Sequence, residues 1–140
     1  MLNNEQITLI QSSFLQVVPR ADPMARMFYA KLFELRPDFR PMFSEDMTDQ
    51  RGKLVSTLAT VVQGLGDLEA LAPAVADLGR RHVGYNVKSQ DYGPVGEALL
   101  WTLGEVLGDA WREETKDAWA AAYSLLSKVM IDAARDVDAA

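Results

Sequence analysis

Hydrophobic residues recur every three or four positions along nearly the whole chain, the spacing that brings side chains to one face of an α-helix. Residues 4–18 are a clear example, and their shared apolar face holds Ile7, Ile10, Phe14, Val17 and Val18. Asn3, with Gln6 three positions later, has the spacing of a capping box and predicts where this helix begins.

The second helix is predicted from its start signal and from a broad apolar arc. Asp22 followed by Pro23 has the residue types of an N-cap and first turn, and opens a helix that runs to about Arg36. Nearly half of its circumference is apolar, with Met24, Ala25, Phe28, Tyr29, Leu32, Phe33 and Leu35. An arc this broad predicts contacts with other elements on two sides.

Proline and glycine predict the remaining boundaries. Pro37 should end the second helix, residues 37–43 fit a short helical turn, and residues 44–48 form a polar loop. Thr48 or Asp49 can cap the third helix. The third helix is predicted to end near residue 63. Three more helices are predicted over residues 67–84, 91–108 and 113–137. Almost no alternation of strand length occurs, so the predicted fold class is all-α with six substantial helices, and the corner-like connections argue against an up-down four-helix bundle.

Length, composition and charge narrow the class of protein. The chain has 140 residues, so we expect one domain over residues 1–140. Hydrophobic residues make up 49% and charged residues 24%, which is ordinary globular composition. The net charge of −6 lacks the basic footprint of a protein that binds nucleic acid or an anionic membrane. The N-terminal sequence has no signal-peptide pattern and no apolar run is long enough to span a bilayer, so we expect a cytoplasmic protein.

The counts of cysteine and histidine limit the possible chemistry. With no Cys and one His, the sequence excludes disulfides, thiolate metal sites and a zinc site of three or four His or Cys ligands. His82 lies on the apolar stripe of Leu71, Val75 and Leu78. Taken alone, the stripe favours a hydrogen-bonded core histidine. A general base and an axial ligand to a buried haem, with the other ring N–H bonded near Leu78, remain open.

Two polar residues also lie next to apolar stripes. Gln50 shares the face of Leu54 and Leu58, where a buried amide needs a partner. Tyr29 lies at the edge of the second helix's apolar arc, where a buried hydroxyl also needs one. Taken singly, Gln50 is more simply an exposed first-turn residue and Tyr29 an ordinary core tyrosine.

Taken together, these residues show a resemblance to a known family. The chain resembles a single-domain bacterial globin related to the globin domain of flavohaemoglobins. Residues 28–43, FYAKLFELRPDFRPMF, are similar to that group's second helix and the corner after it. Residues 49–68 are similar to its distal helix, residues 78–100 to its proximal region, and residues 117–123 to the start of its last helix. The resemblance covers essentially the whole chain and implies a globin fold, with helices packed around a haem pocket.

The resemblance also implies roles for individual residues. His82 would ligate the iron of haem b, and Tyr29 and Gln50 would stabilise a ligand bound on the opposite side. The pocket walls and propionate contacts would come from Phe43, Lys53, Leu54, Leu78, Arg81, Val87, Tyr92 and Val95. That group has a glutamate in its last helix where this chain has Ala134, so Tyr92 would lack a carboxylate partner. We therefore expect less anionic character on His82 and a weaker electronic push toward O–O cleavage, which argues against peroxidase-like chemistry.

The implied function is reversible binding of O₂, and of other diatomic ligands such as NO and CO, at a five-coordinate ferrous haem. Two hydrogen-bond donors would favour tight retention of O₂. The resemblance also implies an alternative, an NO dioxygenase that detoxifies NO with electrons from a separate reductase, because the flavin and nicotinamide domains of flavohaemoglobins are absent from this sequence. A haem-free helical interaction module is the third possibility. Oxygen transport, sensing and detoxification all require the same site.

Overall fold

A computed structural model describes residues 2–84 and 88–139, apart from the side chains at positions 83, 84, 89 and 136–139. These residues form helices and connecting turns, without a strand. The α-helices are α1 (Asn4–Val17), α2 (Ala21–Leu35), α3 (Thr48–Gly64), α4 (Leu68–Gly84), α5 (Tyr92–Leu107) and α6 (Glu113–Ala139). Short 3₁₀ helices connect them: η1 (Val18–Arg20), η2 (Pro37–Met42), η3 (Ser89–Asp91) and η4 (Gly108–Ala110). The predicted all-α class is confirmed, and so is the helical turn at residues 37–43.

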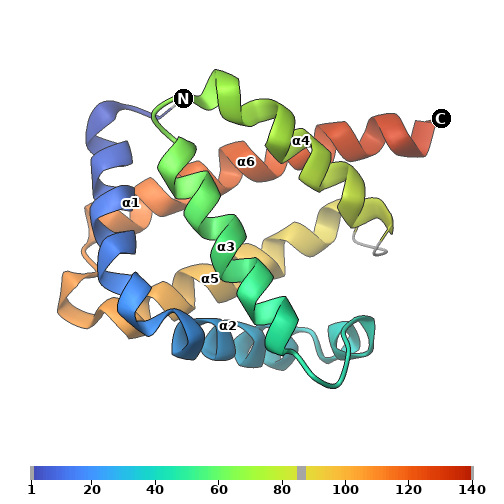
Figure 1. Cartoon of the computed structure of the whole chain (residues 1–140), viewed down its shortest axis with the longest axis horizontal. Helices are drawn as coiled ribbons and strands as arrows, with labels where there is room; N and C mark the ends of the chain where they lie inside the picture. Colours follow the sequence, from blue (N-terminus) through green and yellow to red (C-terminus); the bar gives the residue numbers. More distant parts are fainter. Residues whose placement is uncertain (1, 85–87, 140) are drawn as a thin grey trace.

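The helices cross at steep angles and do not run as a parallel bundle. Figure 1 shows α3 crossing in front of α5 and α6, with α1 on one side and α4 on the other. Helix α4 packs along α6, α2 packs on α5, and α1 packs on α6. The broad apolar arc of α2 has the predicted two partners, because α2 contacts both α5 and α3.

The contact between α1 and α6 shows how the core satisfies its polar groups. The rings of Phe14 and Trp119 lie 6.4 Å apart between centroids. The indole N–H of Trp119 donates to the hydroxyl of Ser13 at 2.8 Å, and that hydroxyl donates to the carbonyl of Leu9 at 2.7 Å. Both side chains are buried, so this pair of bonds removes the cost of burying an unpaired donor.

Gly79 allows α4 to approach α6 very closely. A Cβ built at this position would lie 2.5 Å from the backbone oxygen of Met130, which is closer than real atoms come. Any larger residue would push α4 away from α6. Because His82 follows one turn later, this contact also sets where the imidazole lies.

The helix starts confirm some predictions and correct others. The capping box of α1 is confirmed, because the amide of Gln6 donates to the Asn3 side chain at 2.8 Å and the amide of Asn3 to the Gln6 side chain at 2.9 Å. At the start of α4, the carboxylate of Asp67 accepts a hydrogen bond from the amide of Ala70 at 3.2 Å. The prediction that Asp22 caps α2 is wrong. The helix begins at Ala21, since η1 runs directly into α2 and leaves no extended residue for a cap.

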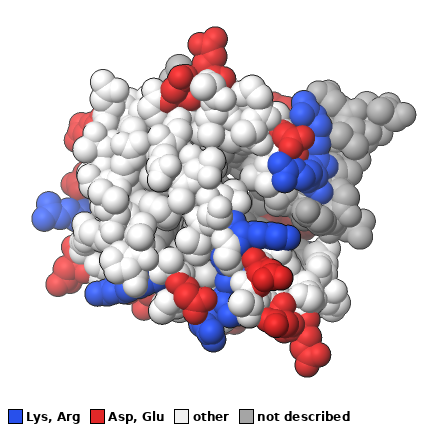
Figure 2. Space-filling model, in the orientation of Figure 1, with Lys and Arg blue, Asp and Glu red and all other residues white. Residues whose placement is uncertain are grey.

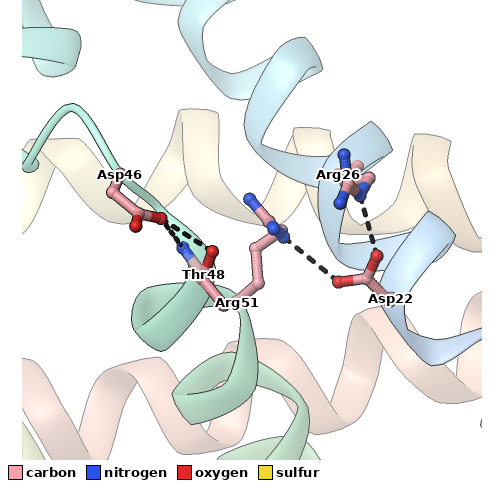
Figure 3. Close-up of polar contacts among 5 residues, drawn as sticks. All are labelled: Asp22, Arg26, Asp46, Thr48 and Arg51. Atoms are coloured by element: carbon pink, nitrogen blue, oxygen red, sulfur yellow. Dashed lines mark hydrogen bonds and ion pairs between the residues drawn. The ribbon is translucent and has the colours of Figure 1, made fainter.

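The cap predicted for α3 also needs correction, and the acidic residue before α5 has another partner. Neither Thr48 nor Asp49 caps α3; the carboxylate of Asp46 accepts both the amide of Thr48 at 2.9 Å and its hydroxyl at 2.7 Å (Figure 3). Asp91 precedes α5 as expected, but its carboxylate accepts the amide of Lys88 at 2.9 Å and makes no bond to α5. Asp46 thus bonds to the first residue of α3, whereas Asp91 bonds within the segment before α5.

Candidate functional site

Tyr29 and Gln50 meet between α2 and the first turns of α3. The side-chain amide of Gln50 donates to the hydroxyl oxygen of Tyr29 at 3.0 Å. Tyr29 is only 7% exposed, so this bond satisfies a hydroxyl that water barely reaches. Because its oxygen is the acceptor here, the hydroxyl still has its own hydrogen to donate to a third group.

Aromatic side chains surround Tyr29 and hold its ring in place. Phe28 and Phe43 meet the ring edge to face, with centroids 4.9 and 5.6 Å away, and Phe33 lies at 6.0 Å. Burial raises the pKa of Tyr29, and the hydrogen bond from Gln50 opposes this only in part. The phenol therefore keeps its proton at neutral pH and above.

His82 lies near the C-terminal end of α4, on the stripe predicted from the sequence. Its Nδ1 is 2.7 Å from the carbonyl oxygen of Leu78, one turn earlier. A carbonyl can only accept, so Nδ1 carries a hydrogen in this contact, and in the neutral ring the lone pair is then on Nε2. This is the form in which a histidine ligates a metal while a backbone carbonyl fixes its ring. The side chain is half-buried and makes the hydrogen bond expected of a histidine on this stripe.

Tyr92 packs beside this histidine at the start of α5. The two ring centroids are 6.4 Å apart and the planes are tilted by 34°. Burial, followed by the charge of Asp91, raises the pKa of Tyr92. The hydroxyl of Tyr123 donates to the Tyr92 carbonyl at 2.6 Å, and Gly96 allows this because a Cβ there would lie 2.6 Å from the Tyr123 ring. Helix α6 thereby fixes the backbone that carries Tyr92.

The remaining apolar residues predicted for the pocket, where the structure describes them, are all partly exposed to solvent. Phe43, Leu54, Leu78 and Val95 are each partly exposed, whereas the core residues beside them are buried. Figure 2 shows the face that contains α3 and α4 hollowed between α3 and the C-terminal half of α4. Val87, predicted as a pocket wall, lies outside the described residues.

The two predicted basic residues have different surroundings. Lys53 is exposed on α3, beside Asp49 and Ser56. The guanidinium of Arg81 is held by the carboxylate of Asp77 on the same helix, at 2.7 Å. Figure 2 shows basic side chains on two sides of the hollow, with acidic ones close by.

Sequence reasoning missed the ionic contacts around the site. Arg51, next to Gln50, donates to Asp22 at 3.1 Å, and Arg36 at the end of α2 lies 3.6 Å from the buried carboxylate of Asp91. Both pairs join residues far apart in the chain, so no local spacing reveals them. Asp22 with Arg26 was the one available signal, since they lie four residues apart on one helix.

Neither a cluster of metal ligands nor a membrane-spanning helix occurs among the described residues. No group of three or more His, Asp or Glu side chains is arranged to hold a metal ion in the described part of the chain. No helix within residues 2–84 and 88–139 is both long and apolar enough to cross a membrane.

The described residues form steeply crossed helices, with the Tyr29–Gln50 pair between α2 and α3 and the single histidine on α4 beside Tyr92 of α5. The globin family model matches residues 26–130, and the chain belongs to the globin family. It is 31% identical over 137 residues to a flavohemoprotein of Vibrio cholerae, covering 94% of this chain and 34% of that protein. The chain thus spans about a third of the length of the curated relatives it matches.

Two solved structures have the same fold over nearly the whole chain. A bacterial globin of Campylobacter jejuni superposes with a TM-score of 0.87 at 25% identity, covering 99% of this chain and all of the other. An engineered carbene transferase from Rhodothermus marinus, whose name assigns it to the nitric oxide dioxygenases, has a TM-score of 0.87 at 27% identity, with 99% and 97% covered. The predicted resemblance to single-domain bacterial globins and to flavohaemoglobins is confirmed.

Proposed function

We propose that this chain binds haem through His82 and reversibly binds O₂ and other diatomic gases beside Tyr29. The observation that carries the proposal is the hydrogen bond from Nδ1 of His82 to the Leu78 carbonyl, because in the neutral ring it leaves Nε2 as the nitrogen that would ligate iron. Membership of the globin family, whose members are haem proteins, supports it.

The residues present fit a haem. Its flat apolar ring needs apolar walls, and the partly exposed Phe43, Leu54, Leu78 and Val95 offer them. The sequence contains no cysteine, so a covalent thioether link is excluded and haem b is the form that fits. It contains no second histidine either, which supports a five-coordinate iron when no gas is bound. When bound, the haem would supply the iron coordination position for the gas.

Tyr29 and Gln50 would distinguish polar from apolar ligands. The Tyr29 hydroxyl holds a hydrogen for a ligand that carries partial negative charge, as O₂ does and CO does much less. The Gln50 amide orients the hydroxyl and polarises it through the 3.0 Å bond. A hydrogen bond to a charged acceptor contributes about 1.5–3 kcal/mol, so Tyr29 would slow the loss of O₂ selectively.

The haem propionates carry negative charge and would take basic partners at the margin of the pocket. Lys53 is the better placed of the two predicted residues, because its side chain is exposed and forms no ion pair within the described part of the chain. Arg81 would have to share its guanidinium with Asp77.

Titration of haem into the purified chain tests the proposal. We expect one haem per chain, with a Soret band that sharpens on reduction and shifts with CO. His82→Ala should lose tight haem binding, while Gln90→Ala, an exposed control in the connection that follows α4, should not. A colourless chain that takes up no haem would leave a haem-free helical module as the function.

A second candidate is an NO dioxygenase that combines O₂, NO and one electron to give nitrate, with a separate reductase as the electron donor. The similarity to flavohemoproteins and to a protein named as a nitric oxide dioxygenase favours it. Sustained NO consumption with an added flavin reductase, at more than one turnover per chain, would support this enzyme. Consumption that stops after one equivalent would leave reversible gas binding as the function.

A further inference from the structure

Helix α3 is attached to α2 at two separate places. One is the bond from Gln50 to Tyr29 described above. The other is an ion pair between Arg51, the next residue, and Asp22, with Nε 3.1 Å from the carboxylate oxygen (Figure 3). Gln50 and Arg51 point to different parts of α2, because adjacent helical residues differ by about 100° in direction.

The two attachments are well separated along α2. Asp22 and Tyr29 are seven residues apart, which is two helical turns and roughly 10 Å along the axis, on the same face. A helix held at one point can still swing about it, whereas two points this far apart fix its direction. The ion pair therefore limits how far the first turns of α3, and the Gln50 amide with them, can move from the Tyr29 hydroxyl.

Burial distinguishes Arg51 from the other arginine on Asp22. The Arg51 side chain is 16% exposed, whereas that of Arg26 is 63% exposed. Arg26 also pairs with Asp22, at 2.7 Å, but both residues belong to α2, so this pair holds nothing across the interface. Asp46 completes the arrangement, because its bonds to Thr48 fix where α3 begins (Figure 3).

We propose that Arg51 is a positioning residue: through its ion pair with Asp22 it holds the Gln50 amide on the Tyr29 hydroxyl and so sustains the preference of the site for polar gases. The inference rests on the proposed function, since it assigns a role within that gas-binding site. Arg51 itself would not contact the ligand and would act only through Gln50.

The test compares Arg51→Met with Arg26→Met, which removes the other partner of Asp22 and leaves the link between helices intact. We expect Arg51→Met to raise the O₂ dissociation rate about fivefold, or about 1 kcal/mol at 1.4 kcal/mol per tenfold, with little change for CO. Arg26→Met should change neither rate. In a Gln50→Leu background, Arg51→Met should add nothing, because no amide remains to be positioned.

Three results would overturn the proposal: an unchanged ratio of O₂ to CO dissociation in Arg51→Met, an equal effect of Arg26→Met, or a full additional effect in the Gln50→Leu background. Haem uptake by the parent chain is measured first, because its failure counts against the proposed function and not against the ion pair. If the parent chain takes up no haem, amide hydrogen exchange in residues 48–54 tests the ion pair instead. Faster exchange in Arg51→Met alone supports a positioning role for the ion pair between Arg51 and Asp22. Equal exchange in Arg51→Met and Arg26→Met refutes that role.

Discussion

Removal of the Tyr29 hydroxyl is the sharpest perturbation of the proposed ligand site. Tyr29→Phe keeps the ring and its edge contacts with Phe28 and Phe43, so the packing around it should persist. What disappears is one hydrogen-bond donor to the ligand and the acceptor of the Gln50 amide.

The size of the effect follows from the surroundings of the hydroxyl. A hydrogen bond to a partly charged ligand contributes about 1.5–3 kcal/mol, and each 1.4 kcal/mol is tenfold in a rate or affinity. Burial of Tyr29 and polarisation by Gln50 both strengthen the bond. We therefore expect O₂ dissociation to be roughly 10- to 100-fold faster in Tyr29→Phe, with CO dissociation changed by less than about threefold.

The assay is stopped-flow displacement of O₂ by excess CO, and of CO by NO, in both proteins. Gln50→Leu should act in the same direction but less strongly, because Gln50 donates to Tyr29. The double variant should resemble Tyr29→Phe alone, since the two residues form one network. Equal changes for O₂ and CO, or fully additive effects, would refute this reasoning and leave Tyr29 as a packing residue.

Three further predictions concern the scaffold and the pocket margin. Gly79→Ala should lower the free energy of unfolding by about 1–3 kcal/mol in a thermal or urea melt, because the new methyl group meets the Met130 backbone; unchanged stability would contradict the close contact. Burial raises the pKa of Tyr123 above its ordinary 10.0, so its contribution to stability is complete below pH 10 and is lost as pH rises towards the folded value. The alkaline fall in stability should therefore be shallower in Tyr123→Phe than in the parent, and parallel curves would count against this assignment. Lys53→Ala should lose haem to an acceptor globin several-fold faster than the parent and Arg81→Ala less so, because Arg81 is already paired with Asp77; identical rates in all three proteins would remove both from the propionate site.

The sequence predicted the helices well because each carries its own periodic stripe. Capping signals were less reliable, since the same residue types serve other partners. Asp22 has the composition of an N-cap, yet its carboxylate binds Arg26 and Arg51, and these hydrogen bonds hold the pKa of Asp22 below its usual range. A local pattern cannot show that an arginine 29 positions away competes for a side chain.

The residues of the candidate site could be predicted from the sequence, but the contacts between helices that hold them could not. Tyr29 and Gln50 each lie on an apolar stripe, and the resemblance to a family put them together; the structure adds that the amide donates to the phenol. The carbonyl partner of His82 follows from helical geometry, because a side chain can reach the carbonyl four residues earlier. The ion pairs of Arg51 with Asp22 and of Arg36 with Asp91 depend on how helices cross, and no single helix contains that information.

Ligation of a haem iron by His82 can be observed by resonance Raman spectroscopy of the ferrous protein. We expect an iron–histidine stretching band in the parent chain reconstituted with haem. The band should be absent in His82→Gly and should return when imidazole is added, because the free ring can occupy the space of the missing side chain. An iron–histidine band that persists in His82→Gly without imidazole, or its absence from the haem-bound parent chain, would contradict ligation of the iron by His82.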